Sequence, residues 1–114
     1  MSDPTDAVQA MTTVDDETAA HRIAEHVIQA RCAACAQVLG PIRSRFHWEG
    51  EVADEQEWLV ILKAPRSTYE SLEAAILEVH PYDVPEILAL PVAAGHAPYL
   101  NWLAEETQAA EPDG

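Results

Sequence analysis

The sequence predicts an α+β fold: a ferredoxin-like split β-α-β sandwich with an antiparallel sheet and a short C-terminal helix. Three observations lead to this prediction. Extended and helical stretches follow one another in the order strand, helix, strand, strand, helix, strand, helix. Turn residues join the two middle strands, and each of the two long helices connects a pair of strands. The 114 residues suit a single domain of this kind.

The first strand and helix are predicted within residues 7–31. Residues 7–12 are expected to form a short strand. Asp15 and Asp16 then open a helix, because their carboxylates can cap its free N–H groups and suit its positive end. The helix continues to about Arg31, since one face carries apolar residues at helical spacing: Ala20, Ile23, Ala24 and Val27.

A hairpin is predicted between the two helices. Residues 36–48 are extended and contain β-branched and aromatic side chains, and Pro41 after Gly40 predicts a kink or bulge. Residues 49–51 supply a turn. The nearly continuous apolar run that follows, in residues 57–64, is typical of a strand covered on both faces.

The second half begins with a predicted capping box, in which Ser67 caps a helix and Glu70 stands three residues later. The helix ends before Pro81, because proline disfavours helical backbone in the residue preceding it. Residues 86–92 are the fourth strand, and residues 98–106 a short final helix with Pro98 in its first turn. The apolar stripe of the second helix consists of Tyr69, Leu72, Ile76 and Val79.

The composition excludes several classes of function. The net charge is −14, from 20 acidic and 6 basic residues, which disfavours nucleic acids and anionic membranes as partners. No apolar run approaches the roughly 20 residues that span a bilayer. Residues 1–6 carry neither a basic region nor an apolar stretch, so a cytoplasmic location is expected. Residues 1–6 and 107–114 are expected to be disordered acidic ends of a domain formed by residues 7–106.

Several segments resemble the CutA family of divalent-ion-tolerance proteins. The most specific is the segment His80-Pro81-Tyr82-Asp83-Val84-Pro85-Glu86, between the second helix and the fourth strand. The others occur in the family's order along residues 7–106: Ala33-Ala34-Cys35, Trp48-Glu49-Gly50, Ile61-Leu62-Lys63 and Tyr99-Leu100-Asn101-Trp102-Leu103. The resemblance implies a non-enzymatic subunit of a tight homotrimer, similar in fold and assembly to the PII signalling proteins, in which neighbouring subunits cover one another's sheet edges.

The resemblance also implies a place for copper. In some relatives the ligands are a cysteine on the first strand and two adjacent histidines before the proline of the HPY segment. Here those positions hold Met11, Val79 and His80, so His80 is the best metal candidate and Met11 could serve Cu(I). The alternatives are that His80 bonds the last carbonyls of the helix and that Met11 belongs to the core. Copper or another divalent cation is therefore an optional ligand, and no cofactor is required.

Cys32 and Cys35 form a C-x-x-C pair. Redox pairs of this kind usually begin a helix, where the dipole lowers the thiol pKa. This pair instead follows the end of the first helix, and a zinc site would need a second ligand pair that is not evident. Both cysteines are therefore interpreted as structural, buried thiols.

A ligand cleft between subunits is a further hypothesis, on the pattern of the PII-like trimers. The alternative is that its aromatic members simply pack the subunit and the trimer. A sensor that binds a small metabolite or nucleotide is therefore the second functional hypothesis after metal tolerance, although six basic residues provide few partners for phosphates. The candidate cleft residues are Trp48, Lys63, Tyr82, Glu86, Tyr99 and Trp102.

Overall fold

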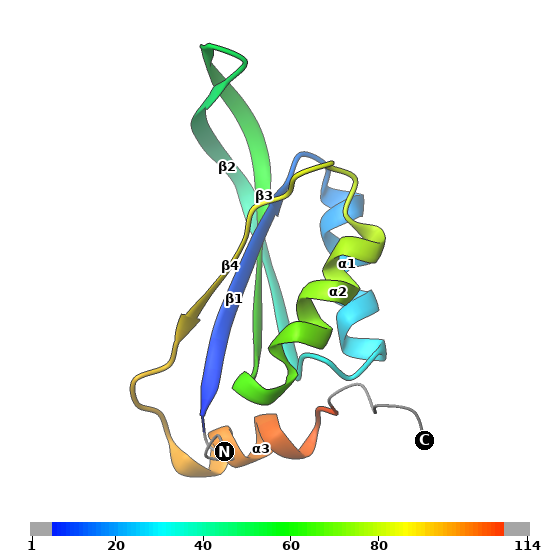
Figure 1. Ribbon diagram of the computed structural model, residues 1–114, viewed down its shortest axis with the longest axis vertical. Coiled ribbons are helices and arrows are strands. Elements are labelled where there is room, and N and C mark those ends of the chain that lie inside the picture. The colour runs from blue at the N-terminus through cyan, green and yellow to red at the C-terminus, as the bar shows by residue number, and fades with distance from the viewer. Residues whose placement is uncertain (1–5, 109–114) are drawn as a thin grey trace.

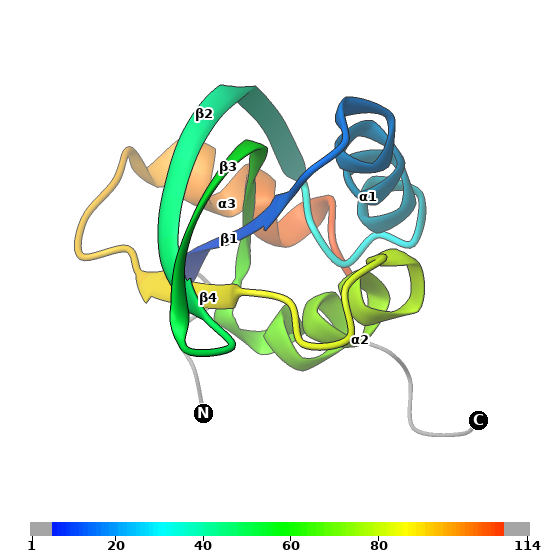
Figure 2. The same ribbon diagram turned by 90° about the horizontal axis from the view of Figure 1, so that it is seen from above.

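In the computed structural model, which describes residues 6–108, a four-stranded antiparallel sheet is covered on one face by two helices (Figures 1 and 2). The strand order is β2-β3-β1-β4, and the third helix lies across one end of the sheet. This confirms the predicted α+β, ferredoxin-like fold. The elements are β1 (Ala7–Val14), α1 (Glu17–Gln29), β2 (Cys35–Trp48), β3 (Glu51–Pro65), the 3₁₀ turn η1 (Arg66–Thr68), α2 (Tyr69–Val79), β4 (Ile87–Pro91) and α3 (Ala97–Glu105).

Helix α1 begins as predicted. The Asp16 carboxylate accepts a hydrogen bond from the Ala19 N–H at 3.0 Å, which satisfies one of the free donors of the first turn. Its apolar face then packs on the sheet through four buried residues, Ala19, Ala20, Ile23 and Val27.

The predicted capping box of α2 is wrong. A 3₁₀ turn precedes the helix, and neither this turn nor α2 has a side-chain cap. The Thr68 hydroxyl instead donates to the Pro65 and Cys32 carbonyls, both at 3.1 Å, and so ties this corner to the end of α1. The end of α2 agrees with the prediction, because His80 adopts extended backbone before Pro81.

Strand β3 is longer than predicted, since it begins at Glu51 rather than at residue 57. Strand β1 pairs only with residues 58–65 of β3, so no third strand of the described chain, residues 6–108, lies beside residues 42–57 of the hairpin. We call residues 42–57 the arm; it extends beyond the rest of the subunit (Figure 1). Isolated two-stranded ribbons are marginally stable in water, so an arm of this length favours contact with another subunit.

The predicted bulge lies where the arm begins. The register of β2 shifts between Leu39 and Ile42, around the Gly40-Pro41 peptide, which is cis. Because successive side chains of a strand point to opposite faces, one extra residue exchanges the faces of every residue beyond it. The bulge therefore places Phe46 and Trp48, rather than Arg45, on the same face as Leu39.

The two faces of the sheet differ in their cover. Residues such as Ala10, Val60 and Leu62 face the helices and are fully buried. Among residues 6–108, α1 and α2 do not cover the opposite face, which we call the open face (Figure 2). Register and alternation place six large apolar side chains there: Met11, Leu39, Leu59, Ile61, Leu88 and Leu90.

The packed domain extends slightly beyond residues 7–106. The Asp6 carbonyl accepts from the Arg66 N–H, and the Gln108 N–H donates to the Arg31 carbonyl at 2.7 Å. Thr107 is buried, and its hydroxyl donates to the Leu103 carbonyl. The remainder of the two predicted disordered ends lies outside the described residues. Within residues 6–108, no helix is both long and apolar enough to cross a membrane.

Thr12 supplies a stability prediction. Its side chain is fully buried, and its hydroxyl has no hydrogen-bond partner among residues 6–108. Thr12→Val should therefore raise the free energy of unfolding by about 1–2 kcal/mol, because it removes an unsatisfied polar group without changing shape. Thr68→Val is the matched control and should lower it by about 1–3 kcal/mol, since that hydroxyl is bonded. Urea unfolding at one protein concentration measures both changes in unfolding free energy. Changes of the same sign in the two variants would contradict the assignment of the Thr12 hydroxyl as unsatisfied.

Candidate functional site

His80 is buried where α2 ends, and both of its ring nitrogens have protein partners. Nε2 lies 3.0 Å from the Thr13 carbonyl oxygen and must donate to it, because a carbonyl only accepts. Nδ1 is then the acceptor, and it receives the Tyr82 backbone N–H at 3.1 Å. The ring also packs edge-on against the Tyr82 ring, with centroids 4.9 Å apart. His80 thus joins the end of β1 to the segment after α2.

Burial lowers the pKa of His80, because the charged imidazolium loses its hydration. The hydrogen bond to Thr13 and the charges of Glu57 and Asp15 oppose this shift without reversing it. Protonation would also place a hydrogen on Nδ1, where the Tyr82 N–H now donates. The neutral ring is therefore the form that holds this corner together.

This arrangement predicts a pH-dependent stability. The pKa of His80 is about 6.5 in the unfolded chain and lower in the folded protein, so the unfolded state takes up the proton first. The stabilisation from His80 should be complete above about pH 6.5 and should decrease as the pH falls toward the folded-state pKa. The loss of unfolding free energy in His80→Asn, about 1–3 kcal/mol at pH 7.5, should therefore shrink at pH 5.5. His21→Asn, at an exposed site, is the control; a loss independent of pH would contradict the prediction.

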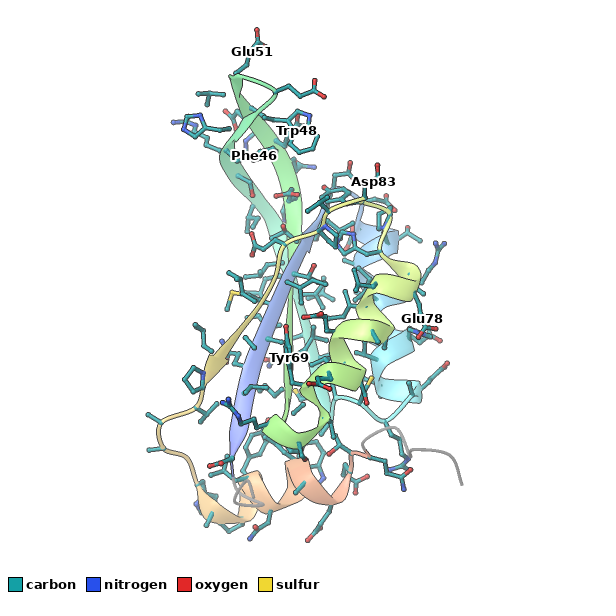
Figure 3. The ribbon with its side chains drawn as sticks, viewed as in Figure 1. Phe46, Trp48, Glu51, Tyr69, Glu78 and Asp83 are labelled. Carbon is teal, nitrogen blue, oxygen red and sulfur yellow. The ribbon has the colours of Figure 1, made fainter. Side chains whose placement is uncertain are left out.

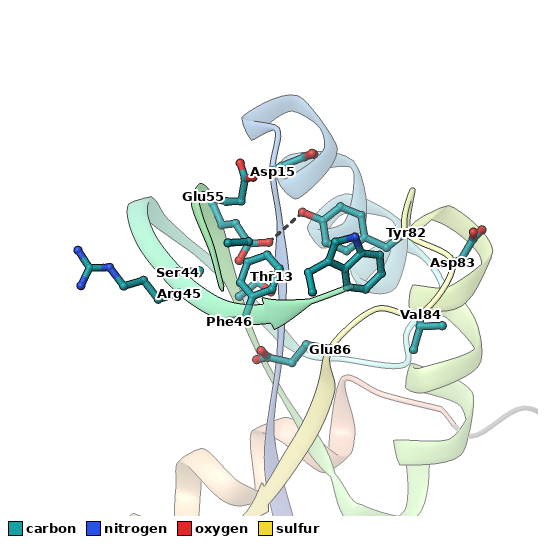
Figure 4. A pocket seen from close by; sticks show the side chains of 13 residues that line it. Thr13, Asp15, Ser44, Arg45, Phe46, Glu55, Tyr82, Asp83, Val84 and Glu86 are labelled. Atoms are coloured by element: carbon teal, nitrogen blue, oxygen red, sulfur yellow. Dashed lines mark hydrogen bonds between the residues drawn. The ribbon is translucent and has the colours of Figure 1, made fainter. Parts of the chain in front are cut away.

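Tyr82 connects this corner to the arm. Its hydroxyl donates to Glu57 Oε2 at 2.8 Å, drawn as a dashed line in Figure 4. Burial raises the pKa of Tyr82, and the hydrogen bond to Glu57 raises it further. The phenol is accordingly a stable donor at neutral pH. Glu57 is only 5% exposed although it is a carboxylate.

An open cleft of about 670 Å³ lies between the arm and the segment that follows α2 (Figure 4). The arm provides one wall, and the end of β1 and the segment of residues 82–86 before β4 contribute to the rest. Three predicted residues, Trp48, Tyr82 and Glu86, come together here. The cleft is lined by Thr13, Asp15, Ser44, Arg45, Phe46, Trp48, Ala53, Glu55, Glu57, Tyr82, Asp83, Val84 and Glu86.

The other three predicted cleft residues do not line this cleft in the subunit. Tyr99 and Trp102 stack on each other in α3, with centroids 5.6 Å apart. Burial raises the pKa of Tyr99, and its interaction with Cys35 adds to the shift. Lys63 pairs in register with Cys35, the residue that interacts with Tyr99. Lys63, Tyr99 and Trp102 therefore lie in or near α3, at the end of the sheet remote from the arm.

The subunit does not bring Met11 and His80 into one set of metal ligands. Met11 alternates with buried Ala10 and Thr12, which places its side chain on the open face. His80 uses both nitrogens within the protein. Among residues 6–108, no group of three or more His, Cys, Asp or Glu side chains is positioned to hold a metal ion. Within the described part of one subunit, Met11 and His80 therefore do not form a shared site.

The two cysteines are free thiols in different surroundings. Cys32 is buried in the core, where burial raises its pKa and its thiol donates to the Val27 carbonyl at 3.5 Å. Cys32 is thus buried as expected, and its structural role stays a prediction. Cys35 is only half-buried and lies on the strand beside Lys63, so it differs from the expectation of a buried side chain.

The sequence pattern did not identify several residues of the cleft. The pattern places Glu57 at the start of an apolar strand and does not single out Phe46 within residues 36–48. The signal that could have identified Glu57 is its position beside a buried apolar run. A carboxylate there is rarely buried without a partner, so a polar contact could have been expected. The sequence predicts both Asp15 and Asp16 at the helix start, but only Asp16 caps α1, and Asp15 lines the cleft.

Comparisons with known proteins agree with the earlier resemblance. The family model described as "CutA1 divalent ion tolerance protein" matches residues 8–106. The divalent-cation tolerance protein CutA of Thermus thermophilus is 39% identical over 97 residues, which are 85% of this chain and 94% of that protein. Its counterpart in Pectobacterium atrosepticum is 38% identical over 98 residues, which are 86% of this chain and 89% of that protein.

Solved structures are similar over nearly the whole chain. The Thermus thermophilus protein has a TM-score of 0.87 at 37% identity, with 90% of this chain and 99% of that chain covered. CutA1 from Oryza sativa has a TM-score of 0.88 at 34% identity, with 92% and 96% covered. The periplasmic divalent cation tolerance protein CutA from Archaeoglobus fulgidus has a TM-score of 0.86 at 27% identity, with 90% of this chain and 99% of that one covered. The cytoplasmic location of this chain therefore stays a prediction.

Proposed function

This chain belongs to the CutA1 divalent ion tolerance family, and we propose that it acts in tolerance to copper as a homotrimer. The family is one of non-enzymatic tolerance proteins, so the proposed role is binding rather than catalysis. The observation that carries the proposal is the family match over residues 8–106, together with similarity to divalent-cation tolerance proteins along the same length.

Copper is proposed to bind weakly and to depend on His80. An imidazole is a common copper ligand, but here a metal would have to replace one of two hydrogen bonds. Met11, on the open face, is a soft ligand that favours Cu(I). One imidazole with water or backbone oxygens makes a poor divalent site, because affinity grows with the number and fixed geometry of the ligands.

Calorimetric titration of the metal-free protein tests this proposal. We expect weak Cu(II) binding that His80→Ala reduces and Met11→Leu leaves unchanged, whereas Met11→Leu should weaken Cu(I) binding. His47→Ala is the matched control, because His47 is an exposed histidine on the arm. Submicromolar Cu(II) affinity that survives in His80→Ala would overturn the assignment, as would equal losses in the His47 control.

The open face supports the homotrimer. Apolar side chains such as Leu88 and Leu90 are 55% and 53% exposed in the subunit, on a face that a soluble protein normally covers. The arm is a second such surface, because a two-stranded ribbon is marginally stable without further contacts. Three copies that face one another through their sheets would cover both.

A second candidate function is a small-molecule sensor, and the cleft favours it. A concave site of about 670 Å³ with aromatic walls has the size of a ligand pocket. Nucleotides are disfavoured, because Arg45 is the only basic residue of the described chain that lines the cleft. Titration with Cu(II), Cu(I), Zn(II) and ATP separates the two candidates.

A further inference from the structure

Helix α3 is attached to the rest of the subunit by a small set of contacts. It crosses the end of the sheet opposite to the arm, whose tip carries Trp48 and Glu51 in Figure 3. It packs mainly on β3, and among residues 97–105 Leu103 is the buried one. Residues 92–96, which precede the helix, form neither helix nor strand. An element with so little buried apolar surface is expected to open more readily than the core.

The C-terminal end of α3 is tied to the end of α1 by Arg31. The Arg31 guanidinium donates to the backbone carbonyl and to the carboxylate of Glu106, both at 3.4 Å. The Arg31 carbonyl accepts the Gln108 N–H at 2.7 Å. Figures 1 and 2 both show the end of α3 beside the segment that follows α1. Assigning the arm and the open face to subunit contacts therefore leaves these contacts in place.

The backbone of Arg31 adopts a conformation that glycine normally provides. Its φ is 59°, and the hydrogen bond from the Cys32 N–H to the Val27 carbonyl closes the end of α1 around it. A residue with a Cβ atom is less stable than glycine in this conformation. The contacts of Arg31 with the chain around Glu106 offset that cost. The strained residue is thus also the one that holds α3, as a latch would.

The ion pair within this latch is weak. The side chains of Arg31 and Glu106 are 56% and 46% exposed in the subunit, so water and salt screen their attraction. The pair can therefore break while the core stays folded. Higher ionic strength favours the broken form, because it weakens the attraction between exposed charges.

Helix α3 also lies against a half-buried thiol. Tyr99, in the first turn of α3, interacts with Cys35 at the start of β2. Cys32, by contrast, is buried in the core, and its thiol donates to the Val27 carbonyl. Movement of α3 away from the sheet therefore uncovers Cys35 and leaves Cys32 protected.

We propose that α3 is a strap that opens from the sheet while the core stays folded, that Arg31 is its latch, and that opening uncovers the Cys35 thiol. The strap responds to ionic strength through the exposed pair of Arg31 and Glu106. This device is independent of metal tolerance and of the small-molecule sensor.

Hydrogen exchange followed by mass spectrometry tests the latch in the assembled protein at neutral pH. Arg31→Asn removes the guanidinium but keeps a residue that tolerates positive φ. It should speed exchange in α3 about three- to tenfold and leave β1 unchanged, because only the strap is released. Glu106→Gln keeps the backbone carbonyl as acceptor and should speed exchange in α3 about twofold.

Glu105→Gln is the matched control. It removes an exposed carboxylate one residue earlier, which forms no ion pair within residues 6–108, and it should leave exchange in α3 unchanged. Raising NaCl from low to molar concentration should speed exchange in α3 relative to β1 in the wild type. The same change of salt should have no such effect in Arg31→Asn, which has no ion pair to screen.

Alkylation by iodoacetamide, read by mass spectrometry at each cysteine, tests what the strap covers. Arg31→Asn should speed the reaction of Cys35 by the same factor as exchange in α3, and leave Cys32 unchanged. Light scattering on each variant shows that its assembly is intact. Equal acceleration at Cys32 would mean that the end of α1 unfolds, and would overturn the strap. Unchanged exchange in Arg31→Asn would mean that another contact, such as a neighbouring subunit, holds α3. Unchanged alkylation of Cys35, or an equal effect of Glu105→Gln, would also overturn the proposal.

Discussion

Leu88→Glu is expected to convert the assembled protein to monomers. Wild-type protein should scatter light with a mass about three times 12.5 kDa at neutral pH and micromolar concentration. Leu88 pairs in register with Met11 on the open face, which we propose meets other subunits. A carboxylate there would be buried without a partner at each contact, which costs several kcal/mol. The variant should therefore have a mass near 12.5 kDa.

Leu77→Glu provides the matched control for this experiment. Leu77 on α2 is 51% exposed, close to the 55% of Leu88, but it lies in the helix layer rather than on the open face. The same substitution there should leave the mass unchanged. A wild-type monomer would refute the homotrimer, and dissociation by Leu77→Glu instead would show that the helices form the contact.

Ile76→Ala is expected to cause a large loss of stability. Ile76 is fully buried between α2 and the rest of the core. Truncation removes buried methyl groups and leaves a cavity that the packed neighbours fill only in part. The free energy of unfolding should fall by about 2–5 kcal/mol, measured by urea unfolding at fixed protein concentration.

The neighbouring residue again gives the control. Leu77→Ala removes a similar side chain one position along the same helix, but from an exposed site. Its effect should stay within about 0.5 kcal/mol. Comparable losses at the two positions would mean that α2 packs through a different face, or that the outer face of α2 is covered in the assembly.

The sequence by itself determined the fold class and most element positions, because these follow from local patterns. The helical spacing of Ile23 and Val27 identified the buried face of α1, and Pro81 marked the end of α2. Gly40-Pro41 correctly predicted a bulge. The most specific family segment, residues 80–86, contains His80 and Tyr82, two residues that organise the corner beside the cleft.

Only the tertiary structure decided which residues share a site, because that depends on contacts between segments distant in the chain. Glu57 and Tyr82 are 25 residues apart, and neither residue's local pattern indicates their hydrogen bond. The one-residue bulge selects Phe46 and Trp48 for the cleft, since it exchanges the faces of the strand beyond it. Tyr99 and Trp102 lie remote from the arm because α3 crosses the opposite end of the sheet. Residue type predicted the candidates, and the relative positions of the strands determined which of them meet.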